Sequence, residues 1–87
     1  MTAKAWTKAE LVECVVESVR QLLPVGADFN PRSSLVAAGL DSLAVTQLML
    51  AIEDRTGIWL DESRLTPENL ENAETLAACV HEQMAEP

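Results

Sequence analysis

The chain has 87 residues and a formal net charge of −8, with 14 acidic residues against 6 lysines and arginines. A surface this acidic repels phosphate backbones, which argues against nucleic acid as a partner. Apolar residues make up 48% of the sequence, enough for one hydrophobic core, and a core of this size leaves little room for a water-excluded catalytic cleft. The composition therefore predicts one folded domain over 1–87.

The first predicted helix follows a lead-in, residues 1–6, which shows no apolar periodicity and is expected to be loose. Thr7 and Glu10 match a capping box, in which a threonine and a glutamate three residues later satisfy each other's backbone N–H groups. Apolar residues then recur every three or four positions as far as Leu23. Pro24 and the glycine that follows two residues later predict the end of this helix.

A long connection covers residues 24–41. Eighteen residues without regular structure are unusual in so small a domain unless they are functional or contain a turn of helix. We expect such a turn around residues 33–36. Phe29, Leu35 and Leu40 are the predicted anchors of this connection to the core.

The second predicted helix runs from Ser42 to Thr56. Asp41 is a suitable N-cap, and Gly57 is suited to the left-handed residue that ends many helices. Leu43 and Leu50 fall outside the predicted apolar stripe, so this helix is apolar over more of its circumference than burial requires. Such an excess is typical of a partner-binding surface, although scattered exposed leucines are also common. The predicted stripe itself consists of Val45, Leu48, Met49 and Ile52.

The last third of the chain predicts short elements and then a final helix. Ile58 and Leu60 are expected to point inward, residues 61–65 to form a single helical turn, and residues 66–68 to begin another such turn. The final helix is expected to begin after Asn72 as its N-cap. Its predicted apolar face contains Leu76, Cys79, Val80 and Met84.

The period-two alternation of β-strands is absent. The predicted fold is therefore all-α: a small bundle of three longer helices with one or two short helices and a long first loop.

Several kinds of site lack the residues that they need. His81 is the only histidine and lies among acidic residues near the C-terminus, so a zinc site is not expected. Cys14 and Cys79 fall on predicted buried faces and are interpreted as small apolar core residues. The sequence shows no apolar run near 18 residues and no signal peptide, so we expect a cytoplasmic protein that does not cross a membrane.

Ser42 remains as the candidate functional residue. A serine on the first turn of a helix is exposed and lies beside backbone N–H groups that favour a negatively charged adduct. No histidine lies nearby in the sequence to activate it as a nucleophile, so Ser42 is interpreted as a residue that is modified. Two alternatives stay open: the chain is a helical protein–protein interaction module in which Ser42 is merely a helix cap, or it is a minimal hydrolase that uses Ser42.

The order of these features resembles the acyl and peptidyl carrier protein family. The resemblance rests on Gly39-Leu40-Asp41-Ser42-Leu43, the amphipathic helix that follows, Gly57-Ile58-Trp59-Leu60 and the final helix, and it covers residues 10–84. It implies that the chain is not an enzyme. It implies that a phosphopantetheinyl transferase attaches 4′-phosphopantetheine from coenzyme A to Ser42, and that cargo then binds as a thioester to the thiol of this arm.

The resemblance also implies residues of partner recognition. Asp41 matches the residue beside the Mg²⁺ site of the transferase, and Leu43 and Leu50 match exposed apolar contacts. Glu53 and Asp54 match acidic positions that pair with basic patches of partner enzymes. The implied partners are the transferase, a loading enzyme (an adenylating ligase or an acyltransferase) and downstream biosynthetic enzymes, and a monomer is expected.

Three features depart from the carriers of bacterial fatty-acid synthesis. Ala44 and Gln47 stand where those carriers usually have acidic residues, and Trp59 stands where a polar residue is common. The segment from Leu65 to Leu70 is more similar to free-standing carriers of specialised metabolism or to those charged with an amino acid. The resemblance thus favours natural-product biosynthesis, with fatty acyl, polyketide and aminoacyl cargo all left open.

Overall fold

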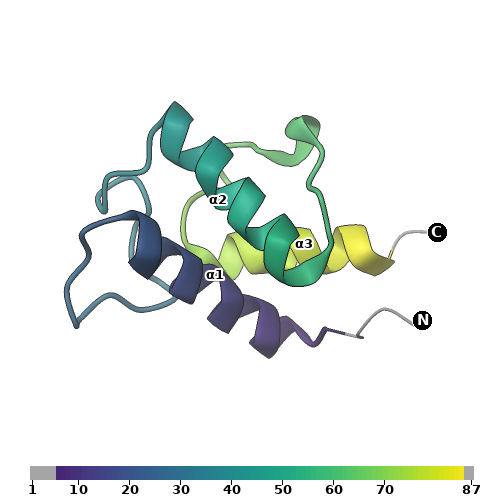
Figure 1. Ribbon diagram of the computed structural model, residues 1–87, viewed down its shortest axis with the longest axis horizontal. Helices are drawn as coiled ribbons and strands as arrows, with labels where there is room; N and C mark the ends of the chain where they lie inside the picture. The colour runs from purple at the N-terminus through teal and green to yellow at the C-terminus, as the bar shows by residue number, and fades with distance from the viewer. Residues whose placement is uncertain (1–5, 86–87) are drawn as a thin grey trace.

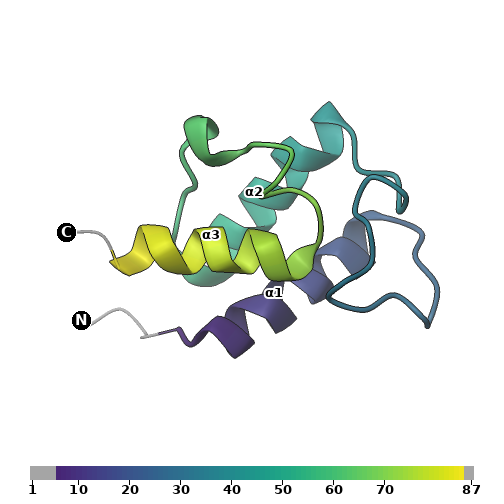
Figure 2. The same ribbon diagram turned by 180° about the vertical axis from the view of Figure 1, so that it is seen from behind.

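The computed structural model describes residues 6–85, and within this range it contains only helices, turns and loops (Figure 1). Helix α1 covers Lys8–Leu22, α2 covers Ser42–Thr56 and α3 covers Ala73–Ala85, and a short 3₁₀ helix, η1, covers Glu62–Arg64. Helix α1 contacts both α2 and α3, so it joins the bundle together. Figure 2 shows the long first loop at the end of the molecule away from both chain ends. The all-α prediction is confirmed.

The ends of the helices form as the local sequence predicts. At the start of α1, the Glu10 N–H donates to the Thr7 hydroxyl at 3.1 Å, and the Thr7 N–H donates to Glu10 Oε1 at 3.0 Å. Gly57 ends α2 in the left-handed conformation with φ 75°. The Thr75 N–H donates to Asn72 Oδ1 at 2.9 Å beside the start of α3. These caps satisfy backbone groups that a helix end would otherwise leave unpaired.

The core lies between the three longer helices and includes anchors from the loops. Leu35 and Phe29 of the first loop and Leu60 before η1 are buried, while Leu40 and Ile58 are half-buried against the same core. Trp6, the last residue of the predicted lead-in, also packs against it, and residues 1–5 lie outside the described residues. The helical side chains that form this core are Leu11, Val15, Val19, Leu48, Met49, Ile52, Ala73, Leu76, Ala77, Cys79 and Val80.

Two details differ from the sequence-based expectation. Ala44 is buried on α2, whereas Val45, which was predicted for the stripe, is half-buried at its edge. Residues 67–70 form a single turn, so the turn expected to begin at residues 66–68 is present but does not extend into a helix. The Leu70 N–H does donate to the Thr66 carbonyl at 3.0 Å, but the chain does not continue the helical pattern beyond that turn.

The first loop is held to the rest of the bundle by hydrogen bonds at three points. The Arg20 guanidinium donates to the Phe29 carbonyl at 2.9 Å and lies 5.9 Å from the centre of its ring. The Leu35 N–H donates to the Glu71 carbonyl at 3.0 Å, and the Glu74 N–H donates to the Pro31 carbonyl at 3.1 Å. The Pro31 carbonyl thereby satisfies a backbone N–H in the first turn of α3. The loop is thus held both by α1, through Arg20, and by α3 with the segment just before it.

Candidate functional site

Ser42 is the first residue of α2, and its side chain is exposed. Its hydroxyl makes no hydrogen bond to any described residue. The Asp41 carboxylate accepts from the Ala44 N–H at 2.8 Å, and the Asp41 carbonyl accepts from the Val45 N–H at 2.8 Å. The cap is therefore made by Asp41, which leaves the Ser42 hydroxyl available for modification.

A single helical turn, residues 34–40, leads directly into this site. The Ser34 hydroxyl accepts from the Ala37 N–H at 3.1 Å, as an N-cap does. At the other end, the Leu40 N–H donates to the Leu35 carbonyl at 2.9 Å and the Gly39 N–H donates to the Val36 carbonyl at 3.0 Å. This pair of bonds, with Gly39 at φ 111°, is the arrangement of a Schellman motif.

The turn is anchored to the core and so holds the chain in place just before Ser42. The side chain of Leu35 is fully buried, and its N–H and carbonyl groups both form hydrogen bonds. Only Asp41 separates the turn from Ser42 at the start of α2. The prediction of a helical turn in this loop is borne out, one residue later than expected, and the turn fixes the direction from which the chain enters α2.

The structure brings no catalytic partner to the Ser42 hydroxyl. His81 is exposed on α3 and makes no hydrogen bond to Ser42 within the described range. The described residues also contain no group of three or more histidine, cysteine, aspartate or glutamate side chains arranged to hold a metal ion. An exposed hydroxyl at a rigid helix start is suited to receive a group from another protein.

The residues that the resemblance implied in partner recognition all reach the surface of α2. Leu43 is 67% exposed and Leu50 is 51% exposed, and the carboxylates of Glu53 and Asp54 are exposed as well. Apolar side chains of this size and exposure, with carboxylates on the same helix, form a surface on which a basic and partly apolar partner could dock.

One exposed residue near the site was missed by the sequence analysis. Val36, in the turn before Ser42, is 71% exposed, the largest value among the exposed large apolar side chains of the described residues. Its neighbour Leu35 is fully buried, so the two residues point in different directions. The signal in the sequence was the pairing of a capping serine, Ser34, with a glycine five residues later, which together predict a one-turn helix with an outward-facing second position.

The two cysteines belong to the core, as predicted. Burial raises the pKa of the Cys14 thiol, an effect that the positive charge of Arg55 and a hydrogen bond with Ser18 partly oppose. Cys79 is also buried, and its sulfur lies 3.8 Å from the Arg64 carbonyl oxygen. Both thiols are buried, whereas a reactive cysteine is exposed to solvent.

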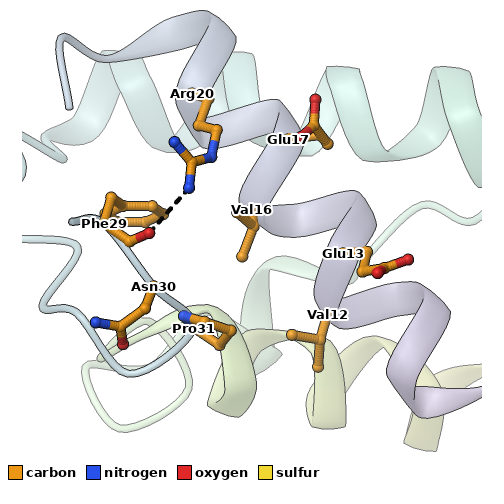
Figure 3. Close-up of a pocket in the computed structure, with 8 residues that line it drawn as sticks. All are labelled: Val12, Glu13, Val16, Glu17, Arg20, Phe29, Asn30 and Pro31. Carbon is orange, nitrogen blue, oxygen red and sulfur yellow. Dashed lines mark hydrogen bonds between the residues drawn. The ribbon is translucent and has the colours of Figure 1, made fainter. Parts of the chain in front are cut away.

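A groove of about 460 Å³ lies between α1 and the first loop, apart from Ser42 (Figure 3). Val12 and Val16 point toward the loop, whereas Glu13 and Glu17 point away from it. Arg20 closes one end through its hydrogen bond to the Phe29 carbonyl, drawn as the dashed line. The residues that line the groove include no nucleophile paired with a base, so Ser42 stays the candidate site.

None of the helices in the described part of the chain is both long and apolar enough to cross a bilayer.

Comparison with known proteins identifies the family. The family model described as a phosphopantetheine attachment site matches residues 13–81. Aminoacyl carrier protein 2 of Bradyrhizobium diazoefficiens is 34% identical over 70 residues, which cover 80% of this chain and 79% of that protein. Aminoacyl carrier protein 1 of the same organism is 33% identical over 70 residues, covering 80% of this chain and 78% of that one.

A solved structure shows the same relationship. A chain in the crystal structure of Bradyrhizobium japonicum glycine:[carrier protein] ligase complexed with glycylated carrier protein is 30% identical, with a TM-score of 0.62. The match covers 83% of this chain and 96% of that one. An exposed serine hydroxyl at the start of a capped helix suits the covalent group of this family. The chain therefore belongs to the acyl and peptidyl carrier proteins, which carry cargo on covalent 4′-phosphopantetheine and are not themselves enzymes.

Proposed function

We propose that Ser42 bears the phosphopantetheine arm and that the arm carries an amino acid as a thioester. The observation that carries this proposal is the exposed Ser42 hydroxyl, which has no hydrogen-bond partner among the described residues and follows an anchored turn and a side-chain cap. The proposed cargo is supported by the two relatives named as aminoacyl carrier proteins and by the glycylated carrier of the solved complex.

The attachment step is a phosphoryl transfer in which the hydroxyl of Ser42 is the nucleophile. Its oxygen forms a bond to the phosphorus that bears the pantetheine unit of coenzyme A, and the bond between that phosphorus and the bridging oxygen breaks. Adenosine 3′,5′-bisphosphate leaves, and the hydroxyl proton passes to a base of the transferase. The product carries a negative phosphodiester at the start of α2, where the helix dipole stabilises it by about 0.3–1 kcal/mol before screening by solvent.

The surface of α2 is the proposed docking site of the partner enzymes. Asp41 is assigned to contact the transferase near its Mg²⁺, and Leu43 and Leu50 to supply apolar contacts. Glu53 and Asp54 are assigned to basic patches of the transferase and of an adenylating ligase that loads the amino acid. Weak, partly electrostatic contacts suit a carrier that must leave each enzyme for the next one.

The proposed setting is specialised metabolism, with downstream enzymes that take the amino acid from the thioester. The arm raises the effective concentration of its cargo at each active site that it reaches. The thioester keeps the acyl carbon reactive toward nucleophiles. Ala44 and Gln47, in place of acidic residues early in α2, support this setting over fatty-acid synthesis.

The attachment is tested by incubating the protein with coenzyme A, Mg²⁺ and a broad-specificity phosphopantetheinyl transferase, followed by intact-mass measurement. We expect the wild type to gain the mass of one phosphopantetheine and Ser42→Ala to gain none. Ser33→Ala removes a nearby loop hydroxyl and is the matched control, which should be modified like the wild type. A folded wild type that stays unmodified would contradict the proposal and favour an interaction module. Ester hydrolysis by the unmodified protein that Ser42→Ala abolishes would favour a hydrolase.

The cargo is tested separately on the modified protein. With ATP, Mg²⁺ and an amino acid:carrier protein ligase, we expect a second mass gain equal to one aminoacyl group. Because the predicted link is a thioester, neutral hydroxylamine should release it, while the phosphopantetheine stays attached. Loading by an acyltransferase with fatty or malonyl groups, and by no amino acid ligase, would contradict the aminoacyl assignment and leave the attachment at Ser42 intact.

A further inference from the structure

Val36 is an exposed apolar side chain on a part of the loop that cannot easily move away. The turn that holds it is closed by hydrogen bonds at both ends, and the carbonyl of Val36 itself accepts from the Gly39 N–H at 3.0 Å. Leu35, immediately before it, is fully buried and bonded to the Glu71 carbonyl. Val36 is therefore presented to solvent from an anchored support, and its exposure of 71% is not the result of a loose segment.

The turn also keeps Val36 close to the attachment residue. The Leu40 nitrogen donates to the Leu35 carbonyl oxygen at 2.9 Å, so Leu35 and Leu40 lie close together in space. Val36 is one residue from Leu35 and Ser42 is two residues from Leu40, so chain geometry holds the Cα atoms of Val36 and Ser42 within about 18 Å of each other. An interface that buries about 800 Å² on each partner is about 30 Å across, so an interface of ordinary size is wide enough to include both Ser42 and Val36.

We propose that Val36 is a specificity-determining contact for the phosphopantetheinyl transferase, where it packs against an apolar surface of that enzyme beside its active site. The inference rests on the proposed function of Ser42. The transferase is the partner of choice because it must bring phosphorus within bonding distance of the Ser42 oxygen itself. Enzymes that act later reach the cargo at the far end of the arm and have less need to cover the turn.

The chemistry of the turn supports an apolar contact over a polar one. Its exposed positions, Ser34, Val36, Ala37 and Gly39, carry no charge, and the largest apolar side chain among them is that of Val36. Leu43 lies one residue beyond Ser42 with 67% exposure. Exposed apolar side chains thus stand on both sides of Ser42 in the chain. The carboxylates of Glu53 and Asp54 lie at the other end of α2. The proposed docking surface is therefore apolar near Ser42 and carries these carboxylates at its far end.

The test compares steady-state modification of Val36→Ser, Val36→Ile and Ala37→Ser, with mass spectrometry as the readout. Removing an exposed apolar side chain that becomes buried in the complex should raise the KM for the carrier by about threefold to tenfold in Val36→Ser. The kcat should stay within about twofold, because such a contact is equally strong before and during the chemical step. Val36→Ile keeps the apolar contact and should keep the wild-type KM.

Ala37→Ser places the same hydroxyl on the same turn without removing an apolar group, and it should behave like the wild type. Equal KM values for Val36→Ser and wild type would overturn the proposal. Equal increases in Val36→Ser and Ala37→Ser would also overturn it, because they would indicate a disturbed turn. Wild-type modification at Ser42 in the same assay shows that the proposed function holds whatever the outcome for Val36, and wild-type unfolding midpoints show that the variants are folded.

Discussion

Asp41 has a structural role that is separable from its proposed role in recognition. Its carboxylate accepts from the Ala44 N–H at 2.8 Å and so caps α2. Asparagine can accept the same hydrogen bond, but it lacks the negative charge that a Mg²⁺-bearing partner would sense. The two roles therefore respond differently to substitution.

Asp41→Ala should lower the free energy of unfolding by about 1 kcal/mol, because the Ala44 N–H loses its acceptor, while Asp41→Asn should stay within a few tenths of a kcal/mol of the wild type. In the transferase assay, both variants should be modified more slowly, because both lack the charge. Urea denaturation and the modification assay together check this. If Asp41→Asn is as unstable as Asp41→Ala, the capping account of this residue is wrong.

Cys14 illustrates why the native thiols do not compete with the thiol of the arm. Its side chain is buried, and burial raises its pKa, so the thiolate fraction near pH 8 is smaller than for a free cysteine. We expect iodoacetamide at pH 8 to label Cys14 far more slowly than a free thiol in the folded protein and readily in urea. Peptide mass mapping measures both rates. Labelling of Cys14 in the folded apo protein at the rate of free cysteine would contradict its placement in the core.

The helix ends show which features of the fold are encoded locally. Thr7 with Glu10, Asp41, and Gly57 each occupy the cap that the sequence predicts. Caps depend on residues at most four positions apart, so local sequence is enough to predict them.

Gly57→Ala tests the cap at the end of α2. At φ 75°, alanine is strained although a Cβ there would meet nothing within 4 Å, so the cost comes from the backbone alone. The free energy of unfolding should fall by about 1 kcal/mol. Gly26→Ala is the control, because Gly26 lacks a positive φ and the closest atom to the new Cβ, Asp28 Oδ1 at 3.0 Å, belongs to a side chain that can move. Equal losses in the two variants in urea denaturation would argue against the left-handed cap as the cause.

The first loop shows what the sequence could not predict. Its anchors, Phe29 and Leu35, were identified from their hydrophobicity, but their bonding partners lie on other elements. The Leu35 N–H bonds to the carbonyl of Glu71, 36 residues later in the chain, and the Pro31 carbonyl accepts from the N–H of Glu74. These hydrogen bonds form only when α3 and the segment before it pack against the loop. Local sequence patterns therefore do not predict them.

The same reason explains the two differences from the expected elements. The signals for a helix at residues 66–68 were a threonine cap and Pro67 at a first helical position. There the Asn69 amide donates to the Arg64 carbonyl and the Asn69 carbonyl accepts from the Thr75 hydroxyl, which ties the turn to both neighbouring elements. On α2, Ala44 is buried and Val45 is half-buried, because the packing of α1 against α2 decides which edge of the stripe is covered. The candidate site was predictable from Asp41 and Ser42, whereas Val36 required the closed turn to be seen.

At the scale of the whole molecule, charge should govern association. The net charge is −8, and the exposed carboxylates of Glu53 and Asp54 lie on the proposed docking helix. Binding to a loading enzyme should therefore weaken as salt rises from about 0.05 M to about 0.5 M, because the Debye length falls below the spacing of surface charges. Calorimetric Kd values across this range check the effect, with Glu53→Gln/Asp54→Asn expected to show a shallower salt dependence than wild type. A Kd that does not change with salt would contradict electrostatic docking.

The central claim is that one hydroxyl, that of Ser42, carries the arm. The most direct measurement is tandem mass spectrometry of peptides from the modified wild-type protein, because it locates the phosphodiester on a single side chain. We expect the fragment ions to place the group on Ser42, with the side chains of Ser33, Ser34 and Ser63 unmodified. Phosphopantetheine found on any other residue, or spread over several serines, would contradict it.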